Sequence, residues 1–179
     1  SLDRRQRQMC IRDRCSNDLL ASCIFKSPGD LGIDIAVGTM QRFGVPMYFG
    51  GPHPAYLACD GKFLRYMPGR IIGESIDIKG TPCYRLGLQT REQHIKKEKA
   101  TSNICTSQAL LANIASMYAI YHGESGITNI ANNIHRLTEK LHSWCVFNDI
   151  EVMNDTYFDT VTFKHPHADW IQDHLYENG

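Results

Sequence analysis

The sequence predicts an α/β fold, and three observations lead to that prediction. A buried strand is expected over 33–37, because this short apolar run is followed by the Gly- and Pro-rich segment 38–53. Amphipathic helices are expected over 106–122 and 127–145, where apolar residues recur at the spacing of one helical face. Several other short apolar runs along the chain are as long as typical β-strands. A strand that ends in a Gly-rich turn is where α/β enzymes expose chemistry, at the carboxyl end of a sheet.

Composition and charge narrow the class of protein. The chain of 179 residues is long enough for one ordinary domain, and its 19 basic and 19 acidic residues cancel, which argues against a nucleic-acid binder. No apolar run could span a membrane and the N-terminus lacks a secretory h-region, so neither a membrane protein nor a secreted one is expected. The seven cysteines form no Cys-x-x-Cys pair, and the eight histidines are scattered. Free thiols in a reducing compartment and no metal site are therefore expected.

The first fourteen residues, Ser1–Arg14, differ in character from the rest. They are strongly basic and nearly without apolar side chains. We interpret them as a disordered or non-native tail and keep them out of the fold prediction. The functional alternative is a basic arm that binds nucleic acid.

In the first half of the chain the predicted elements are short. The apolar run Asp18–Phe25, closed by Lys26-Ser27-Pro28-Gly29, predicts a second buried strand ahead of the one at 33–37. The remaining predictions are a strand at 56–59, a helical turn at 62–67 and two apolar runs, 71–73 and 84–88, around a hairpin-like segment.

In the second half, Gly123 is predicted to end the first amphipathic helix. Two strands are predicted at 150–153 and 157–163, joined by a turn, and a last helix begins near Ala168. Because that helix is cut short at Gly179, we expect the chain to be truncated there. The helical stripes predicted to be core are Leu110, Leu111, Ile114, Met117, Tyr118 and Tyr121, and then Ile127, Ile130, Ile134, Leu137, Leu141 and Trp144.

The segment 88–106 is the most unusual polar stretch. Basic residues and His94 precede a predicted helix start, and helix-capping residue types follow them. This arrangement can gather an anion at a helix N-terminus, whereas the alternative is a solvated loop with an ordinary cap. Cys105 lacks an identifiable base, so a packed thiol is expected there rather than a nucleophile.

Several unbroken motifs stand out along the chain. They are Gln41–Met47, Gly50–His53, Met67–Arg70, Leu88–His94, Lys99–Thr106, Gln108–Asn113, His122-Gly123 and Ile134–Leu137. Together they resemble one enzyme family, glycine decarboxylase, the pyridoxal-phosphate subunit (P-protein) of the glycine cleavage system. The resemblance covers about 18–163, and several motifs of this length do not match by chance.

The resemblance implies the aspartate-aminotransferase-like fold, fold type I of the pyridoxal-phosphate enzymes. Such a P-protein has two halves of similar architecture, fused or as separate subunits, and this sequence resembles part of the amino-terminal, non-catalytic half. Residues 15–125 would be part of its large α/β domain. Residues 126–179 would begin its small, here incomplete, α+β C-terminal domain.

The position of Gln41 is the main chemical consequence of the resemblance. The family's catalytic half carries Lys-Thr-Phe-x-Ile-Pro before a glycine run, and aligning Phe43, Pro46 and Gly50-Gly51-Pro52 with that pattern places Gln41 at the lysine position. A carboxamide cannot form an imine, so no catalytic or cofactor-binding residue is expected here. Asp18 is expected on the strand where such enzymes often keep the acid that pairs with the pyridine nitrogen. Without a lysine to hold the cofactor, we expect Asp18 to be structural or vestigial.

Four polar residues of the resembling motifs, His53, Arg91, His94 and Lys99, are candidates for a cleft or interface shared with the catalytic half. The planar guanidinium of Arg91 suits a substrate carboxylate best. Salt bridges at the surface or between halves are the alternative for each residue. Tyr48 departs from the family, which has glycine there.

The implied enzyme is an oxidoreductase of glycine catabolism. It decarboxylates glycine with pyridoxal phosphate, held by the catalytic half, and passes the aminomethyl group to the lipoyl H-protein. A dimer or heterotetramer in the mitochondrial matrix or bacterial cytoplasm is implied, and this segment alone is expected to be inactive. The alternatives are a purely structural or interaction module, a complete small pyridoxal enzyme using Lys62 or Lys79, and the nucleic-acid binder.

Overall fold

The computed structural model describes residues 12–47, 49–51, 53–67, 71–88, 98 and 108–178. The chain divides into two compact units, which are described separately. Unit 1 holds residues 1–18 and 27–118, and unit 2 holds residues 19–26 and 119–179. Within the described ranges no helix combines the length and apolarity needed to cross a membrane.

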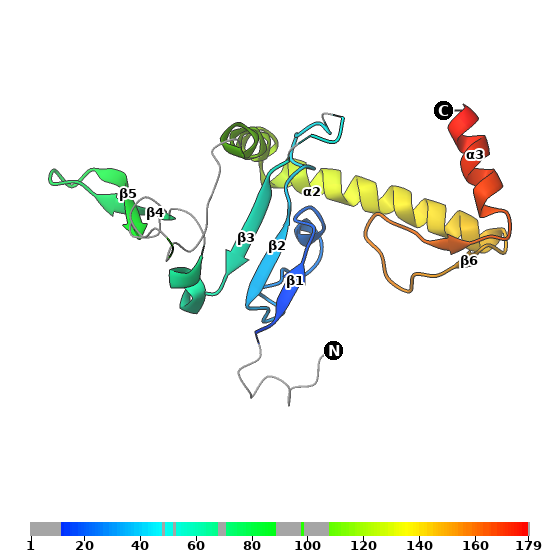
Figure 1. Cartoon of the computed structure of the whole chain (residues 1–179), viewed down its shortest axis with the longest axis horizontal. Helices are drawn as coiled ribbons and strands as arrows, with labels where there is room; N and C mark the ends of the chain where they lie inside the picture. Colours follow the sequence, from blue (N-terminus) through cyan, green and yellow to red (C-terminus); the bar gives the residue numbers. More distant parts are fainter. Residues whose placement is uncertain are drawn as a thin grey trace. The chain divides into compact units, whose positions relative to one another are not determined.

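A three-stranded sheet forms the base of unit 1. Its order is β1 (Arg14–Ser16), β2 (Ile35–Thr39) and β3 (Ala55–Cys59), with β1 parallel and β3 antiparallel to the central β2 (Figure 1). The predicted strands at 33–37 and 56–59 are confirmed, the first beginning two residues later than expected. Arg14 pairs with Ile35, so β1 begins inside the segment that was assigned to the tail.

The prediction of a buried strand over 18–25 is wrong. The regular element in this run is the 3-10 helix η2 (Ala21–Cys23), and the Phe25 N–H donates to the Ala21 carbonyl at 2.9 Å. Only Leu20 of the run is buried, at 2% exposure. A short apolar run has too few residues for periodicity to separate a strand from a helical turn, and the turn forms here.

Two short elements follow the sheet in unit 1, and both confirm their predictions. The 3-10 helix η3 (Gly61–Tyr66) is capped by Asp60, whose side chain accepts from the Lys62 N–H at 3.1 Å. Strands β4 (Ile71–Ile76) and β5 (Pro82–Leu88) form an antiparallel hairpin. At its tip the Asp77 carboxylate accepts from the N–H groups of Lys79 and Thr81, each at 2.8 Å.

The long helix α2 (Ala109–Phe147) is interrupted at Gly123, whose φ of 62° and ψ of −179° are not helical. The predicted glycine stop is therefore confirmed, and two helical segments meet there. The predicted start at Thr106 lies outside the described residues.

The prediction that the apolar stripes of α2 are core is only partly right. The buried side chains include Leu111 and Ala115 in unit 1 and Ala131 and Cys145 in unit 2. Leu111 belongs to a predicted stripe, whereas Ala115, Ala131 and Cys145 are smaller residues outside the stripes. The stripe residues that stay exposed are Leu110, Met117, Tyr121, Leu137, Leu141 and Trp144.

Unit 2 continues with β6 (Glu151–Val152), which pairs antiparallel with β7 (Phe163–Lys164), and ends with α3 (Ala168–Asn178). The predicted final helix is confirmed, but the strand predicted over 157–163 begins only at Phe163. Aromatic packing accounts for this difference. The Tyr157 ring stacks on His142, with centroids 4.9 Å apart, and the Phe158 carbonyl lies 2.8 Å from the His135 Nδ1, so both residues face the helix instead of pairing as a strand.

Candidate functional site

The carboxyl ends of the parallel strands β1 and β2 lie at one edge of the three-stranded sheet, called here the Gln41 edge. Asp18 follows β1 there, Gln41 follows β2, and His53 precedes β3, which runs the other way. This is the edge at which open α/β sheets place ligand sites. The sequence predicted exposed chemistry at this edge, after the strand over 33–37.

Backbone hydrogen bonds hold the turn that carries Gln41. The Gln41 N–H donates to the Thr39 hydroxyl at 3.2 Å, and the Gln41 carbonyl accepts from the Val45 N–H at 3.1 Å. The Met40 N–H donates to the Pro54 carbonyl at 2.9 Å, which ties the turn to the start of β3. These bonds hold the backbone of the turn at Gln41, whose side chain is half-buried.

Packing against the first segment of α2 fixes the same turn. Phe43 and Val45 are buried, and the Phe43 ring meets the Tyr118 ring edge-on with centroids 5.9 Å apart. Gly44 has a φ of 76°, and a Cβ added there would lie 2.7 Å from the Tyr118 Cδ2. Glycine is thus required both for the backbone conformation and for the close approach of Tyr118.

An ion pair joins the turn to the end of β1. The Arg42 Nε lies 3.1 Å from the Asp18 Oδ2, with side chains 40% and 32% exposed. Asp18 lies two residues beyond β1 and so is not on a strand as expected. Its carboxylate contacts the guanidinium, which is consistent with the structural role expected for it.

A polar contact that the sequence prediction missed lies beside the ion pair. Tyr56 donates its hydroxyl to the Asn17 carbonyl at 3.1 Å, and the Asn17 amide nitrogen lies 3.3 Å from the same hydroxyl. A Cβ at Gly38 would come within 2.1 Å of the Asn17 carbonyl oxygen and 2.6 Å of the Tyr56 ring. A glycine inside a strand often marks such a close approach, and Gly38 was the available signal.

The described side chains at the Gln41 edge do not fit a covalently held pyridoxal phosphate. They supply the carboxamides of Asn17 and Gln41, the Asp18–Arg42 ion pair, the Tyr56 phenol and the His53 imidazole. An imine requires a nucleophilic amine, and a carboxamide nitrogen is not one. The edge can therefore donate and accept hydrogen bonds and present an ion pair, but Gln41 cannot attach the cofactor.

Of the four candidate cleft residues, only His53 lies among the described residues. His53 is exposed and directly precedes Pro54, whose carbonyl bonds the Met40 N–H, so it lies at the Gln41 edge. Arg91, His94 and Lys99 lie outside the described residues, as do Tyr48 and Cys105. Their sharing of a cleft stays a prediction.

Lys62 lies at the opposite end of the sheet. Its ammonium bonds the Asp34 carboxylate and lies 3.5 Å from Asp60, and Asp34 also accepts from the Asp13 N–H at 3.1 Å. Lys62, Asp34 and Asp60 border a hollow of about 440 Å³. The hydrogen bond to Asp34 raises the pKa of Lys62, and the bond from Lys62 lowers the pKa of Asp34. An imine-forming lysine needs a lowered pKa, so this environment argues against Lys62 as a cofactor lysine.

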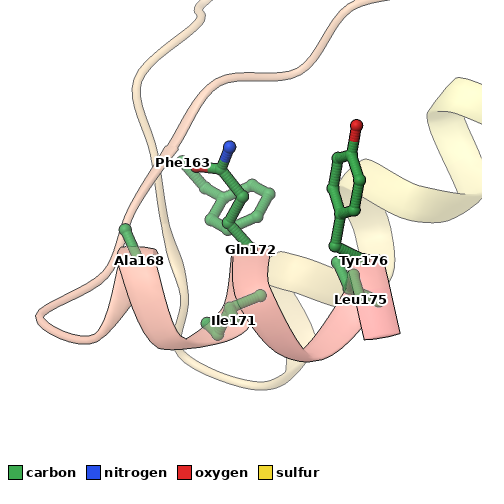
Figure 2. Close-up of a pocket in the computed structure, with 6 residues that line it drawn as sticks. All are labelled: Phe163, Ala168, Ile171, Gln172, Leu175 and Tyr176. Carbon is green, nitrogen blue, oxygen red and sulfur yellow. The ribbon is translucent and has the colours of Figure 1, made fainter. Parts of the chain in front are cut away.

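A larger hollow, of about 730 Å³, lies in unit 2 (Figure 2). Its described lining residues offer one amide, from Gln172, and one phenol, from Tyr176, but no carboxylate, amine, imidazole or thiol. In the described ranges, no three His, Cys, Asp or Glu side chains are grouped to bind a metal ion. The lining residues are Phe163 of β7 and, from α3, Ala168, Ile171, Gln172, Leu175 and Tyr176.

Comparison with known proteins gives one consistent result. The family model described as "Glycine cleavage system P-protein" matches residues 1–177, a range that includes the basic segment at the N-terminus. A glycine dehydrogenase (decarboxylating) of Bradyrhizobium is 57% identical over 147 residues, and one of Psychromonas ingrahamii is 54% identical over 149 residues. These alignments cover 82% and 83% of this chain.

A solved structure is similar in fold as well as in sequence. The crystal structure of glycine decarboxylase (P-protein) of the glycine cleavage system, in inhibitor-bound form, matches 92% of this chain with a TM-score of 0.79 and 34% identity. The match covers 38% of that chain, and this chain spans about 15% of the length of the curated relatives.

We predict that Gly44→Ala destabilises unit 1 by about 2–4 kcal/mol. A non-glycine residue is strained at this φ, and its Cβ would clash with the Tyr118 ring. The measurement is urea denaturation followed by far-UV circular dichroism. Gly61→Ala is the control, because a Cβ there meets no atom within 4 Å. Equal stability of the two variants would contradict the packing described for the turn.

The Asp34–Lys62 pair predicts a pH-dependent stability. The lowered pKa of Asp34 means that its contribution is present above about pH 4 and is lost as the pH falls through that lowered pKa. The raised pKa of Lys62 means that its contribution is present below about pH 10 and is lost as the pH rises through the raised pKa.

Asp34→Asn should therefore lower the urea midpoint most near neutral pH, and its effect should shrink toward strong acid and strong base. Asp173→Asn, at an exposed position of α3, is the control and should change the midpoint little at any pH. An effect of Asp34→Asn that is the same at all pH values would rule out the ion pair as its source.

Proposed function

The chain belongs to the glycine cleavage system P-protein family, and we propose that it forms part of the half of that enzyme that does not hold the cofactor. The observation that carries this proposal is the Gln41 turn. Its backbone is fixed by Phe43, Gly44 and the Arg42–Asp18 ion pair, yet the residue that it presents at the sheet edge cannot form an imine.

In this proposal the chain supports the active site of the catalytic half. The reaction of the whole enzyme is the decarboxylation of glycine, with pyridoxal phosphate of the catalytic half as the electron sink and the lipoyl H-protein as acceptor of the aminomethyl group. The assembly is a dimer or heterotetramer, in the mitochondrial matrix or the bacterial cytoplasm. Residues 15–125 belong to the large domain of this half, and 126–179 begin its small domain.

The contribution of this half to the cleft is proposed to come from His53, Arg91, His94 and Lys99. Arg91 binds the glycine carboxylate, because a guanidinium offers two parallel N–H donors to a carboxylate. The place of His53 at the Gln41 edge supports its inclusion. The other three rest on their motifs in the sequence.

Cofactor attachment can be tested on the full-length enzyme. After addition of pyridoxal phosphate and reduction with borohydride, peptide mass spectrometry should find the label on a lysine of the catalytic half and none on peptides of this chain. The raised pKa of Lys62 is the physical reason that it stays unlabelled even though it is accessible. Label on Lys62 or Lys79 would overturn the proposal in favour of a self-contained pyridoxal enzyme.

Substrate binding is tested by Arg91→Ala in the full-length enzyme. Loss of a charge-assisted hydrogen bond should raise the KM for glycine about tenfold or more. Arg85→Ala, which removes an exposed arginine of β5, is the matched control and should leave KM unchanged. If Arg91, His94 and Lys99 can all be replaced without effect on turnover, this half is a purely structural module.

A further inference from the structure

A tyrosine side chain lies across the central strand close to the Gln41 edge. Tyr56 is directly opposite Gly38 in the ladder between β2 and β3, and its ring lies against that glycine: a Cβ at Gly38 would be 2.6 Å from the ring carbon Cε1. The Tyr56 hydroxyl donates to the carbonyl of Asn17, which follows β1, at 3.1 Å. The Asn17 N–H in turn donates to the Val37 carbonyl of β2 at 2.9 Å. Tyr56 thus connects the three strands, which lie side by side in Figure 1.

Further polar side chains at this edge are also bonded within unit 1. The Arg42 Nε lies 3.1 Å from the Asp18 Oδ2. The Thr39 hydroxyl donates to the Pro54 carbonyl at 3.4 Å and accepts from the Gln41 N–H at 3.2 Å. The residues whose polar side chains are engaged in this way are called here the edge cluster. They are Asn17, Asp18, Thr39, Arg42 and Tyr56.

The side chains of the edge cluster are of the kinds that pyridoxal phosphate sites use. The ring nitrogen of the cofactor pairs with an aspartate or an arginine, and its phosphate takes charge-assisted hydrogen bonds from guanidinium and hydroxyl groups. Here the Asp18 carboxylate and the Arg42 guanidinium neutralise one another, and backbone carbonyls hold the hydroxyls of Thr39 and Tyr56. A cofactor would have to break these bonds, so it would gain only the difference between the contacts made and those lost.

We propose that the edge cluster excludes pyridoxal phosphate from this half in addition to Gln41, an inference that rests on the proposed function. Gln41 removes the amine that forms the imine, and the edge cluster ties up the groups that would orient the cofactor. The two obstacles are separate, because Gln41 contributes its backbone N–H to the cluster, a group that a lysine would also supply. Returning a lysine to position 41 should therefore not restore attachment unless Arg42 and Tyr56 also release their partners.

The test is borohydride trapping in variants of the full-length enzyme. Gln41→Lys supplies the amine and keeps the edge cluster, whereas its combination with Arg42→Gln and Tyr56→Phe also frees the partners of these two residues. After addition of pyridoxal phosphate and reduction, peptide mass spectrometry measures the labelled fraction at position 41. The single variant should show only the level of an exposed lysine such as Lys140. The combined variant should exceed that level about tenfold or more, since a charge-assisted hydrogen bond changes an equilibrium by about that factor.

Gln41→Lys with Arg85→Gln and Tyr84→Phe is the matched control, because it changes the same residue types at exposed positions of β5. It should be labelled no more than Gln41→Lys alone. Circular dichroism checks that each variant folds, and Gln41→Lys with Arg42→Gln is the second variant if the triple variant does not. Label in Gln41→Lys alone, or no gain in a folded variant with the cluster released, would overturn the proposal. The lysine that is labelled in the unchanged enzyme decides the proposed function separately.

Discussion

The close approach of Tyr118 to the turn at Gly44 is the constraint on which the Gln41 edge depends. Without a side chain, Gly44 allows the tyrosine ring to lie against the backbone, and Phe43 then packs on that ring. The contact joins the end of β2 to the first segment of α2. It holds the turn from one side while the Thr39 hydroxyl and the Pro54 carbonyl hold it from the other. Because its backbone is held from both sides, the turn can present the Gln41 side chain in a fixed position.

What this edge presents is hydrogen-bonding and charged groups in place of a nucleophile. Arg42 engages Asp18, and Asn17 engages Tyr56, so the polar side chains beside Gln41 bond to one another. The backbone of the turn is held as firmly as a catalytic turn would be, but Gln41 stands where a cofactor-binding lysine would supply an amine. This combination supports the proposal that the chain borders the active site of the other half and does not itself attach the cofactor.

Prediction from the sequence succeeded where a local rule was sufficient. Gly123 interrupts α2, the hairpin forms around Asp77 and Gly80, and Gln41 follows the central strand, each as expected from turn and helix chemistry. It failed at 18–25, where periodicity was too short to decide, and at 157–162, where rings on α2 compete with strand pairing. At the Gln41 edge, the sequence motifs pointed to Gln41 and His53. The Arg42–Asp18 and Asn17–Tyr56 contacts could not be predicted, because each joins residues that are far apart in the sequence.

By itself, the sequence determined the family, the order of most elements and the missing amine, because these depend on residue identity and spacing along the chain. The tertiary structure alone decided which side of α2 is buried, which partner Asp18 takes, and that Tyr56 bonds Asn17 across β2. Those properties depend on segments far apart in sequence meeting in space. An apolar stripe in the sequence shows which residues of a helix can be buried. Whether those residues are buried depends on the segments that pack against the helix.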